Sequence, residues 1–412
     1  METLKTQAKE LLLSPDLLSL VSLVTRMIGT HEDPHKLEAK AIFAHCSQNY
    51  PNTLSLKLTH LLQSSTQSPL TAAYATFLSS LLTGHSHKIS PMILTELKPL
   101  LFACFQRQTL EPILKPLALS IGIVALRVYK TKHADWQELL DYIVSSADSE
   151  DQKYRELGLI LFSELPMKMG RFLMPTFDSL YLTILKCFSS PTMNHRSFGF
   201  RMSLILVVHL EGFVDYDSIK DLLPAMLKFL IELMNDRQDG STELCLKNLN
   251  SLVKENAKFF KKHLKHVCET MLQIVEADYV GEKIRYAAMD IVRALNDSLN
   301  TEMFALMQNL TGENLHRLIS ASMDMLVRIK DDPILYNMDF NVTFEDINGG
   351  QMESYDLGSF LLDQISAAVA GDVCLPITLK LTQQYLAAPE WQKHHAAMAT
   401  LSIVAEECSE VQ

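Results

Sequence analysis

The sequence has few of the residues and patterns that strand-rich folds require. Only 14 of its 412 residues are glycine, and no run of alternating apolar and polar residues lies between clear turn signals. Apolar residues make up 48% of the chain and charged residues 21%. A sizeable core is therefore available, and global disorder is excluded. The composition predicts an all-α protein.

The sequence also lacks the motifs that carry common chemistry. It contains no G-x-x-x-x-G-K-[ST] or G-x-G-x-x-G phosphate loop, no H-E-x-x-H, no G-x-S-x-G and no kinase signature. Its densest histidine groups, at 85–87, 263–266 and 394–395, have no cysteine or carboxylate partners at zinc spacing. The acid pairs at 331–332 and 406–407 fit a solvated loop and a solvated helix end. We predict that the protein is not an enzyme, with no catalytic residue, no metal site and no cofactor.

Further absences bear on compartment and partners. The seven cysteines are scattered singly without a C-x-x-C pair, which fits a reducing compartment and no disulfide framework. The first residues, METLKTQAKELLL, are too charged for a secretory signal, and the most apolar run, 202–210, is too short to span a membrane. A net charge of −11 argues against general binding to a phosphate backbone. We predict no membrane and no direct nucleic-acid partner, and the acidity is compatible with a basic protein partner.

What the sequence does contain is a repeated apolar pattern. Helical segments beginning at Ile219, Leu264 and Ile284 each carry apolar residues at i, i+3, i+4, i+7, i+8 and i+11. On a helix of 3.6 residues per turn, these positions form one continuous stripe. The first two stripes begin 45 residues apart, with another helix between them. A helix pair that recurs at this period predicts a HEAT or armadillo-type solenoid, because each pair buries its stripe only against its neighbours.

The same pattern extends along the chain and predicts a single right-handed α-solenoid of about nine helix pairs over residues 1–412. Basic residues recur near the start of second helices, at Arg155, Arg196, Arg285 and His394/His395, where we expect them to cap or bridge neighbouring repeats. A polar, acidic insert at 330–355 interrupts the eighth pair. The pairs are expected at about 17–47, 51–83, 91–130, 134–166, 172–211, 215–256, 259–297, 312–370 and 373–408.

Several segments of these pairs resemble a known family. The run E-W-Q-K-H-H-A begins at Glu390 and leads into L-S-I-V-A-E-E-C, which ends at Cys408. This run is similar to the importin-β (karyopherin-β) family of nuclear transport receptors, and most similar to the importin-5-like branch and its plant members. The resemblance covers the N-terminal half of such receptors, collinearly over about 17–412. Further similar segments are P-N-T-L-S-L-K-L-T-H-L-L at 51–62, D-L-L-P-A-M at 221–226, M-L-Q-I-V-E-A-D at 271–278 and V-R-I-K-D-D-P at 327–333.

The resemblance implies a receptor of the cytoplasm and nucleus that imports protein cargo. Receptors of this family bind cargo on a concave face, and the Phe-Gly repeats of nucleoporins dock between their outer helices. Ran-GTP contacts the second helices of the first repeats, here within 34–46, 68–82 and 111–128, and also the acidic insert. The insert residues that would bind a partner are Asp331, Asp332, Asp339, Glu345, Asp346, Glu353 and Asp356.

Departures from the family pattern keep an alternative open. Asparagines and the Gly349-Gly350 pair dilute the acids of the insert, and Ser and Thr occupy 70–82 where the family typically has arginines. Their loss removes bidentate hydrogen-bond donors. The chain also stops within the ninth repeat, so it is either a shortened paralogue or an incomplete sequence. The alternative is a HEAT scaffold or adaptor that has lost Ran-dependent transport. A regulatory subunit of a phosphatase or ligase complex would share the solenoid but would have no reason to carry the acidic insert.

Overall fold

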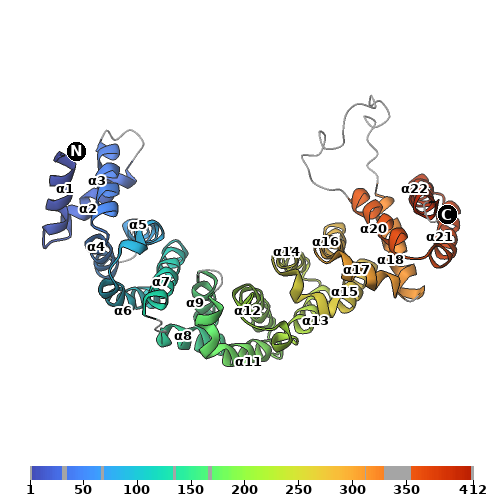
Figure 1. The fold of residues 1–412 in the computed structure, drawn as a ribbon, viewed down its shortest axis with the longest axis horizontal. Coiled ribbons are helices and arrows are strands. Elements are labelled where there is room, and N and C mark those ends of the chain that lie inside the picture. Colours follow the sequence, from blue (N-terminus) through green and yellow to red (C-terminus); the bar gives the residue numbers. More distant parts are fainter. Residues whose placement is uncertain are drawn as a thin grey trace. The chain divides into compact units, whose positions relative to one another are not determined.

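The computed structural model describes residues 2–29, 35–65, 69–132, 136–165, 169–310, 312–328 and 354–409, and every regular element in these ranges is a helix. The contacts divide the chain into two compact units, Met1–Asp215 and Tyr216–Gln412. Each unit is a stack of helix pairs (Figure 1). The predicted all-α solenoid class is confirmed, whereas the extent of one solenoid over 1–412 and its repeat boundaries stay a prediction.

The first unit has two layers of helices. The second helices of its pairs contact one another in chain order, and each also packs on the first helix of its own pair. The first-helix layer contains α2 (Leu18–Ile28), α4 (Pro51–Ser64), α6 (Pro91–Arg107), α8 (Gln137–Ala147) and α11 (Phe177–Phe188). The second-helix layer contains α3 (His35–Asn49), α5 (Pro69–His85), α7 (Glu111–Lys132), α9 (Gln152–Ser163) and α12 (Met193–Leu210). α1 (Glu2–Leu13) precedes these pairs and packs on α3, and three short helices join other elements: η1 (Ser86–Lys88), α10 (Gly170–Leu173) and η2 (Met174–Thr176).

The second unit repeats this arrangement. Its first-helix layer contains α13 (Leu222–Asn235), α15 (Leu264–Glu276), α18 (Gly312–Leu326) and α21 (Gly371–Leu386). Its second-helix layer contains α14 (Asp239–Asn256), α16 (Glu282–Ser298), α20 (Ser354–Ala368) and α22 (Trp391–Ser409). Within each layer, every helix contacts the next. The short helices are η3 (Tyr216–Ile219), η4 (Ala257–Phe259) and η5 (Lys261–His263), and α17 (Asn300–Gln308) packs on α15, α16 and α20.

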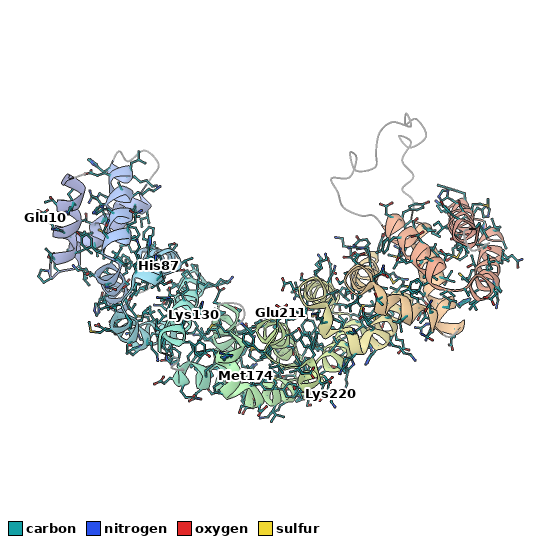
Figure 2. All side chains as sticks on the ribbon, in the orientation of Figure 1. Glu10, His87, Lys130, Met174, Glu211 and Lys220 are labelled. Carbon is teal, nitrogen blue, oxygen red and sulfur yellow. The ribbon has the colours of Figure 1, made fainter. Side chains whose placement is uncertain are left out.

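The apolar stripes form the core between the layers, where side chains fill the space (Figure 2). Of the 18 stripe residues, only Cys268 and Ala287 are half-buried, and the others are buried. Burying one large aliphatic side chain contributes about 1.5–3 kcal/mol, so these stripes supply the main force that stacks the pairs.

The first stripe begins outside its α-helix. Ile219 lies in η3, and α13 begins only at Leu222. Pro224 explains this start, because a proline in a helix interior removes a hydrogen bond and clashes with the carbonyl four residues earlier. Beginning at Leu222 places Pro224 in the first turn, where its missing N–H needs no partner.

Polar contacts between neighbouring pairs keep the predicted spacing. Arg201 donates to Glu156, 45 residues earlier, and Arg317 donates to Glu276, 41 residues earlier. Where residues 329–353 intervene, the separation grows: Asn296 of α16 donates to Gln364 of α20, 68 residues later. These contacts therefore join neighbouring repeats about 41–45 residues apart, and the larger separation between Asn296 and Gln364 reflects the insert.

Basic residues near the start of second helices contact carbonyls at the C-terminal ends of the preceding first helices, which confirms the expected capping role. Arg285 donates to the carbonyls of Val275, Ala277 and Val280 over 2.6–3.0 Å. Arg155 and Arg196 donate to the carbonyls of Ser149 and Ser190 over 2.7 and 2.8 Å, and His394 Nε2 lies 2.6 Å from the carbonyl of Ala388. These carbonyls lie in the last turn of a first helix or just after it, where no intrahelical donor remains.

One helical stretch, Glu111–Thr131 in α7, is long and apolar enough to cross a membrane by length and composition, with 56% of its apolar window buried in the chain. α7 contacts α5, α6 and α9. Packing within the first unit therefore accounts for its apolar composition.

Candidate binding groove

Negative charge is concentrated in the last quarter of the chain. Residues 1–300 contain 32 Lys and Arg and 32 Asp and Glu, whereas residues 301–412 contain 5 and 16. The whole net charge of −11 therefore comes from 301–412, within the second unit. A region of one charge sign attracts ligands of the opposite sign.

Within this region, a groove lies between α20 and α22. These two helices are neighbours in the second-helix layer (Figure 1). We call it the acidic groove. Its α20 residues follow the spacing i, i+1, i+4, i+5 and i+8, which places them on one helix face. No lysine or arginine is among the described residues that line it. The lining residues are Tyr355, Asp356, Ser359, Phe360 and Asp363 of α20, with Ile403 and Glu406 of α22.

The charge of Asp356 acts on two nearby phenols. Burial, followed by the charge of Asp356, raises the pKa of Tyr355. Tyr286 of α16 also has a raised pKa, because it is half-buried and because Asp290 and Asp356 outweigh the opposing charge of Arg293. Both phenols therefore stay protonated at neutral pH. The Tyr355 hydroxyl lies 3.2 Å from His395 Nε2 and so links α20 to α22 beside the groove.

The neighbouring acids of α16 have a different environment. Asp290 accepts two hydrogen bonds from Arg293, over 2.6 and 2.9 Å, and another from Asn250 of α14. Arg293 also donates to Asp297 over 2.8 Å. Asp290 and Asp297 of α16 are thus paired with Arg293 of their own helix. Asp356, Asp363 and Glu406 line the groove, whose described walls are apolar, polar and acidic.

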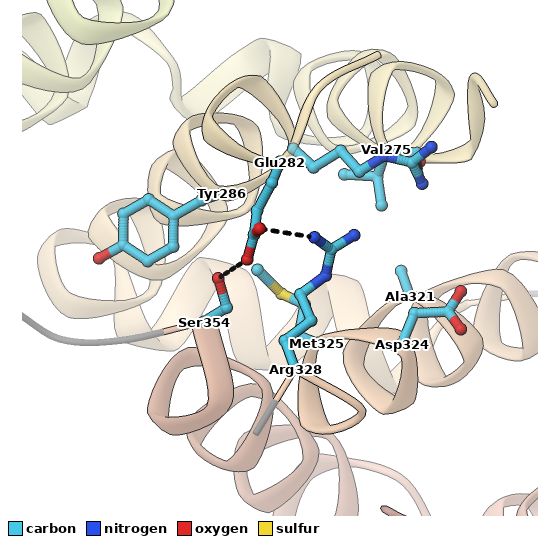
Figure 3. Close-up of a pocket in the computed structure, with 9 residues that line it drawn as sticks. Val275, Glu282, Tyr286, Ala321, Asp324, Met325, Arg328 and Ser354 are labelled. Atoms are coloured by element: carbon cyan, nitrogen blue, oxygen red, sulfur yellow. Dashed lines mark hydrogen bonds and ion pairs between the residues drawn. The ribbon is translucent and has the colours of Figure 1, made fainter. Parts of the chain in front are cut away.

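Three helix ends meet at Glu282, near the start of α20 (Figure 3). Glu282 is the first residue of α16, Ser354 is the first of α20, and Arg328 follows the end of α18. Arg328 Nη1 lies 3.2 Å from Glu282 Oε2, and Ser354 Oγ donates to Glu282 Oε1 over 3.5 Å. One carboxylate therefore contacts both described residues that border 329–353.

Other polar groups of this small pocket have their own partners. The guanidinium of Arg285 donates to three carbonyls, and Asp324 accepts a hydrogen bond from the Tyr385 hydroxyl over 2.5 Å. Among the side-chain contacts described for this pocket, Glu282 makes those that reach both borders of 329–353.

The predicted insert residues have different outcomes. Asp356 lies on α20 and lines the acidic groove. The remaining six, which stay predictions, lie outside the described residues: Asp331, Asp332, Asp339, Glu345, Asp346 and Glu353.

Sequence reasoning missed most of the groove. Asp363 follows Asp356 by seven residues, two helical turns along the same face, so this pair was visible in the sequence. The sequence predicts a solvated helix end at Glu406, and this residue is exposed. Its place beside Asp363 depends on the packing of α22 on α20, which no local pattern records.

The arrangement suits the binding of cations attached to a larger molecule. Within the ranges that the structure describes, no group of three or more His, Cys, Asp and Glu side chains is placed to hold a metal ion. The groove carboxylates are instead spread along two helices with Phe360 between them. This spacing matches several charged side chains of an extended segment better than a single ion.

Comparisons with known proteins agree with this fold. A family model described as a repeat of unknown function (DUF577) matches residues 94–263. Importin subunit beta-3 of Saccharomyces cerevisiae is 22% identical over 285 residues, which cover 67% of this chain and 24% of the importin. The crystal structures of Kap121p bound to RanGTP and of Kap121p bound to Nup53p match with TM-scores of 0.71 and 0.74, both at 17% identity.

Both matches to Kap121p cover 96% of this chain but only 36% and 37% of Kap121p. The chain thus spans about a quarter of the length of the curated relative and just over a third of that of the solved relatives. This partial coverage fits the resemblance to the N-terminal half of the receptors. The chain is therefore similar in sequence to importin subunit beta-3 and shares the α-solenoid fold of Kap121p, in agreement with the resemblance to the importin-β family.

Proposed function

We propose that the chain is an importin-β-type transport receptor that binds protein cargo through a basic segment held in the acidic groove. The observation that carries this proposal is the groove itself, in which three carboxylates and two aromatic rings line the space between α20 and α22. The concentration of negative charge in 301–412 supports it. The work of the chain is binding, not catalysis, in the cytoplasm and the nucleus.

The groove chemistry favours lysine-rich or arginine-rich segments. A lysine places its ammonium against a carboxylate while its methylene stem packs on an apolar surface. Asp356, Asp363 and Glu406 offer the carboxylates, and Phe360 and Ile403 offer the apolar surface. A half-buried aromatic face also attracts cations directly. An extended basic segment satisfies all of these contacts at once.

Two further partners belong to this proposal. Kap121p has been solved with RanGTP and with Nup53p, which supports Ran-GTP and Phe-Gly nucleoporins as partners of this chain. Ran-GTP would contact the second helices α3, α5 and α7, together with the insert residues Asp331, Asp332, Asp339, Glu345, Asp346, Glu353 and Asp356. Nucleoporins would dock on the first-helix layer.

Charge reversal in the groove tests the cargo site. A fluorescein-labelled lysine-rich peptide is titrated with the chain, and the same peptide with glutamine at its lysines serves as the ligand control. We expect Asp363→Lys and Glu406→Lys each to weaken binding about ten-fold or more, since each replaces an attraction of about 1.4 kcal/mol or more by repulsion. Glu255→Lys, at an exposed acid of α14, makes the same change of charge away from the groove and should bind like the wild type. Equal affinity for both peptides, or groove variants that bind like the wild type, would refute the cargo site.

A non-transporting scaffold is the second candidate, and α5 favours it. Thr76, Ser80 and Thr83 are its exposed residues along 76–83, and the helix contains no lysine or arginine. Binding of GTP-locked Ran and accumulation of a basic cargo in the nuclei of permeabilised cells separate the two. A receptor shows both activities, whereas a scaffold binds the peptide but shows neither.

A further inference from the structure

We propose that Glu282 is a positioning residue for the acidic groove: from α16, one helix away, it fixes the first turn of α20 and the two borders of 329–353. The inference deepens the proposed function and rests on it, since the groove is taken to be the cargo site. Figure 3 shows the Glu282 carboxylate between Arg328 and Ser354, with a contact to each.

The position of Glu282 is electrostatically favourable for a carboxylate. It lies in the first turn of its own helix, α16, and contacts the first residue of α20. Helix N-termini carry partial positive charge and free N–H groups, so an anion is stabilised at both. Arg328, just beyond the end of α18, adds a full positive charge at 3.2 Å. Two helix N-termini and the guanidinium of Arg328 therefore lie around one carboxylate.

The contact between Glu282 and Ser354 lies one peptide bond away from Tyr355, the first residue that lines the groove. Ser354 directly precedes Tyr355 and Asp356, which line the groove, and all three lie in the first turn of α20. A helix moves as a stiff element, so the anchored end sets the position of the residues that follow. Tyr286, in the same pocket as Glu282, has its pKa raised partly by Asp356, which places the groove carboxylate within electrostatic reach of this pocket.

Glu282 also contacts Arg328, on the other side of residues 329–353. Arg328 lies on the near side of 329–353 and Ser354 on the far side, and the same carboxylate contacts both. Glu282 therefore joins the two ends of this 25-residue stretch at a point beside the groove. Removing the carboxylate breaks the contacts that the first residue of α20 and Arg328 make with Glu282, while the hydrogen bond from Asn296 to Gln364 remains.

The test compares peptide binding with the local stability of α20 in the full chain. The variants are Glu282→Ala, Glu282→Gln, Arg328→Ala and the double variant Glu282→Ala/Arg328→Ala. The matched control is Glu255→Ala, an exposed acid of the same unit. The first readout is the affinity for the fluorescein-labelled lysine-rich peptide. The second is hydrogen exchange of the amides at 358–362, whose helical hydrogen bonds accept at carbonyls 354–358.

We expect Glu282→Ala to weaken peptide binding about three- to five-fold, the range of a partly exposed ion pair, and to speed exchange at 358–362. Glu282→Gln keeps an acceptor for Ser354 and should fall between the wild type and Glu282→Ala. The double variant should bind no more weakly than Glu282→Ala, because both substitutions break the same contact. Glu255→Ala should match the wild type in both readouts.

Two results overturn the proposal: unchanged exchange at 358–362 in Glu282→Ala, or equal weakening in Glu282→Ala and Glu255→Ala, which would make net charge the cause. If the wild type binds no lysine-rich peptide, the proposed cargo site fails by itself. Faster exchange in Glu282→Ala would then still support the positioning of α20 by Glu282.

Discussion

Arg285 shows how a single side chain closes a helix in this fold. Its guanidinium donates to three carbonyls beyond or at the end of α15, while Arg155 and Arg196 each reach one such carbonyl. A cation at a helix C-terminus also interacts favourably with the helix dipole. The same device thus recurs from pair to pair with different strength.

Replacing Arg285 by methionine should lower the free energy of unfolding of the second unit by about 2 kcal/mol. The substitution keeps most of the apolar stem but leaves the carbonyls of Val275, Ala277 and Val280 without a charged donor, and hydrogen bonds to charged groups contribute about 1.5–3 kcal/mol. Urea unfolding, with hydrogen exchange of 264–298 to localise the effect, measures it. Lys283→Met removes the same charge from an exposed site of the same helix and should change little. A Lys283→Met loss as large as that of Arg285→Met would contradict the cap.

The buried cysteines act as small apolar residues, as their scatter in the sequence predicts. Cys46, Cys104, Cys187, Cys245 and Cys374 are buried free thiols. Burial raises the pKa of Cys46 and Cys187 to about 11, so their reactive thiolate forms are scarce at neutral pH. Packing, not redox chemistry, accounts for their positions.

At the scale of helices, close approach of backbones fixes how α20 sits on α18. A Cβ added at Gly358 would lie 2.6 Å from the carbonyl oxygen of Ser322 and 2.9 Å from Met325 Cβ. Since the nearest atom belongs to the α18 backbone, it cannot rotate away. The small residue at 358 therefore lets the two helices of this pair approach each other where the groove begins.

Gly358→Ala should destabilise the second unit by about 1–3 kcal/mol, because overpacking forces backbone shifts of this cost. The same substitution at Gly240, near the start of α14, meets nothing within 4 Å and should be neutral or stabilising by up to about 1 kcal/mol. Thermal or urea unfolding of the two variants decides the matter. If both glycines tolerate alanine equally, the close contact of α18 and α20 does not limit the fold.

The helices that sequence could predict are those with a long apolar stripe. The stripes from Ile219, Leu264 and Ile284 share one apolar pattern and the first two begin 45 residues apart, so the local pattern was enough to place them. The sequence does not predict α17, because this helix buries only Met303 and Met307, too few for a periodic apolar pattern. The sequence does not predict the groove for another reason. Asp363 and Glu406 lie on different helices, and only the packing of α22 on α20 brings them to the same groove.

At the scale of the whole molecule, apolar packing is found along the whole described chain, whereas the net charge is confined to one region. Both units stack helix pairs by the same apolar contacts, but residues 1–300 are neutral overall and residues 301–412 carry the full −11. The contacts that build the solenoid thus do not require this asymmetry. A surplus confined to one region instead creates a field that extends beyond any single groove residue.

This field predicts that the distributed charge and the groove contacts affect different rates of peptide binding. Distributed charge steers encounter and acts on the association rate, whereas close contacts in the groove act on the dissociation rate. Stopped-flow measurement with the lysine-rich peptide should therefore give an association rate that falls about ten-fold or more from 20 to 300 mM salt, as the screening length shrinks. Asp363→Asn should keep most of that salt dependence, because it removes one of the 16 acids of 301–412, yet it should dissociate several-fold faster. An association rate that ignores salt would mean that the charge of 301–412 does not guide the peptide, and an unchanged dissociation rate in Asp363→Asn would remove the groove from the contact.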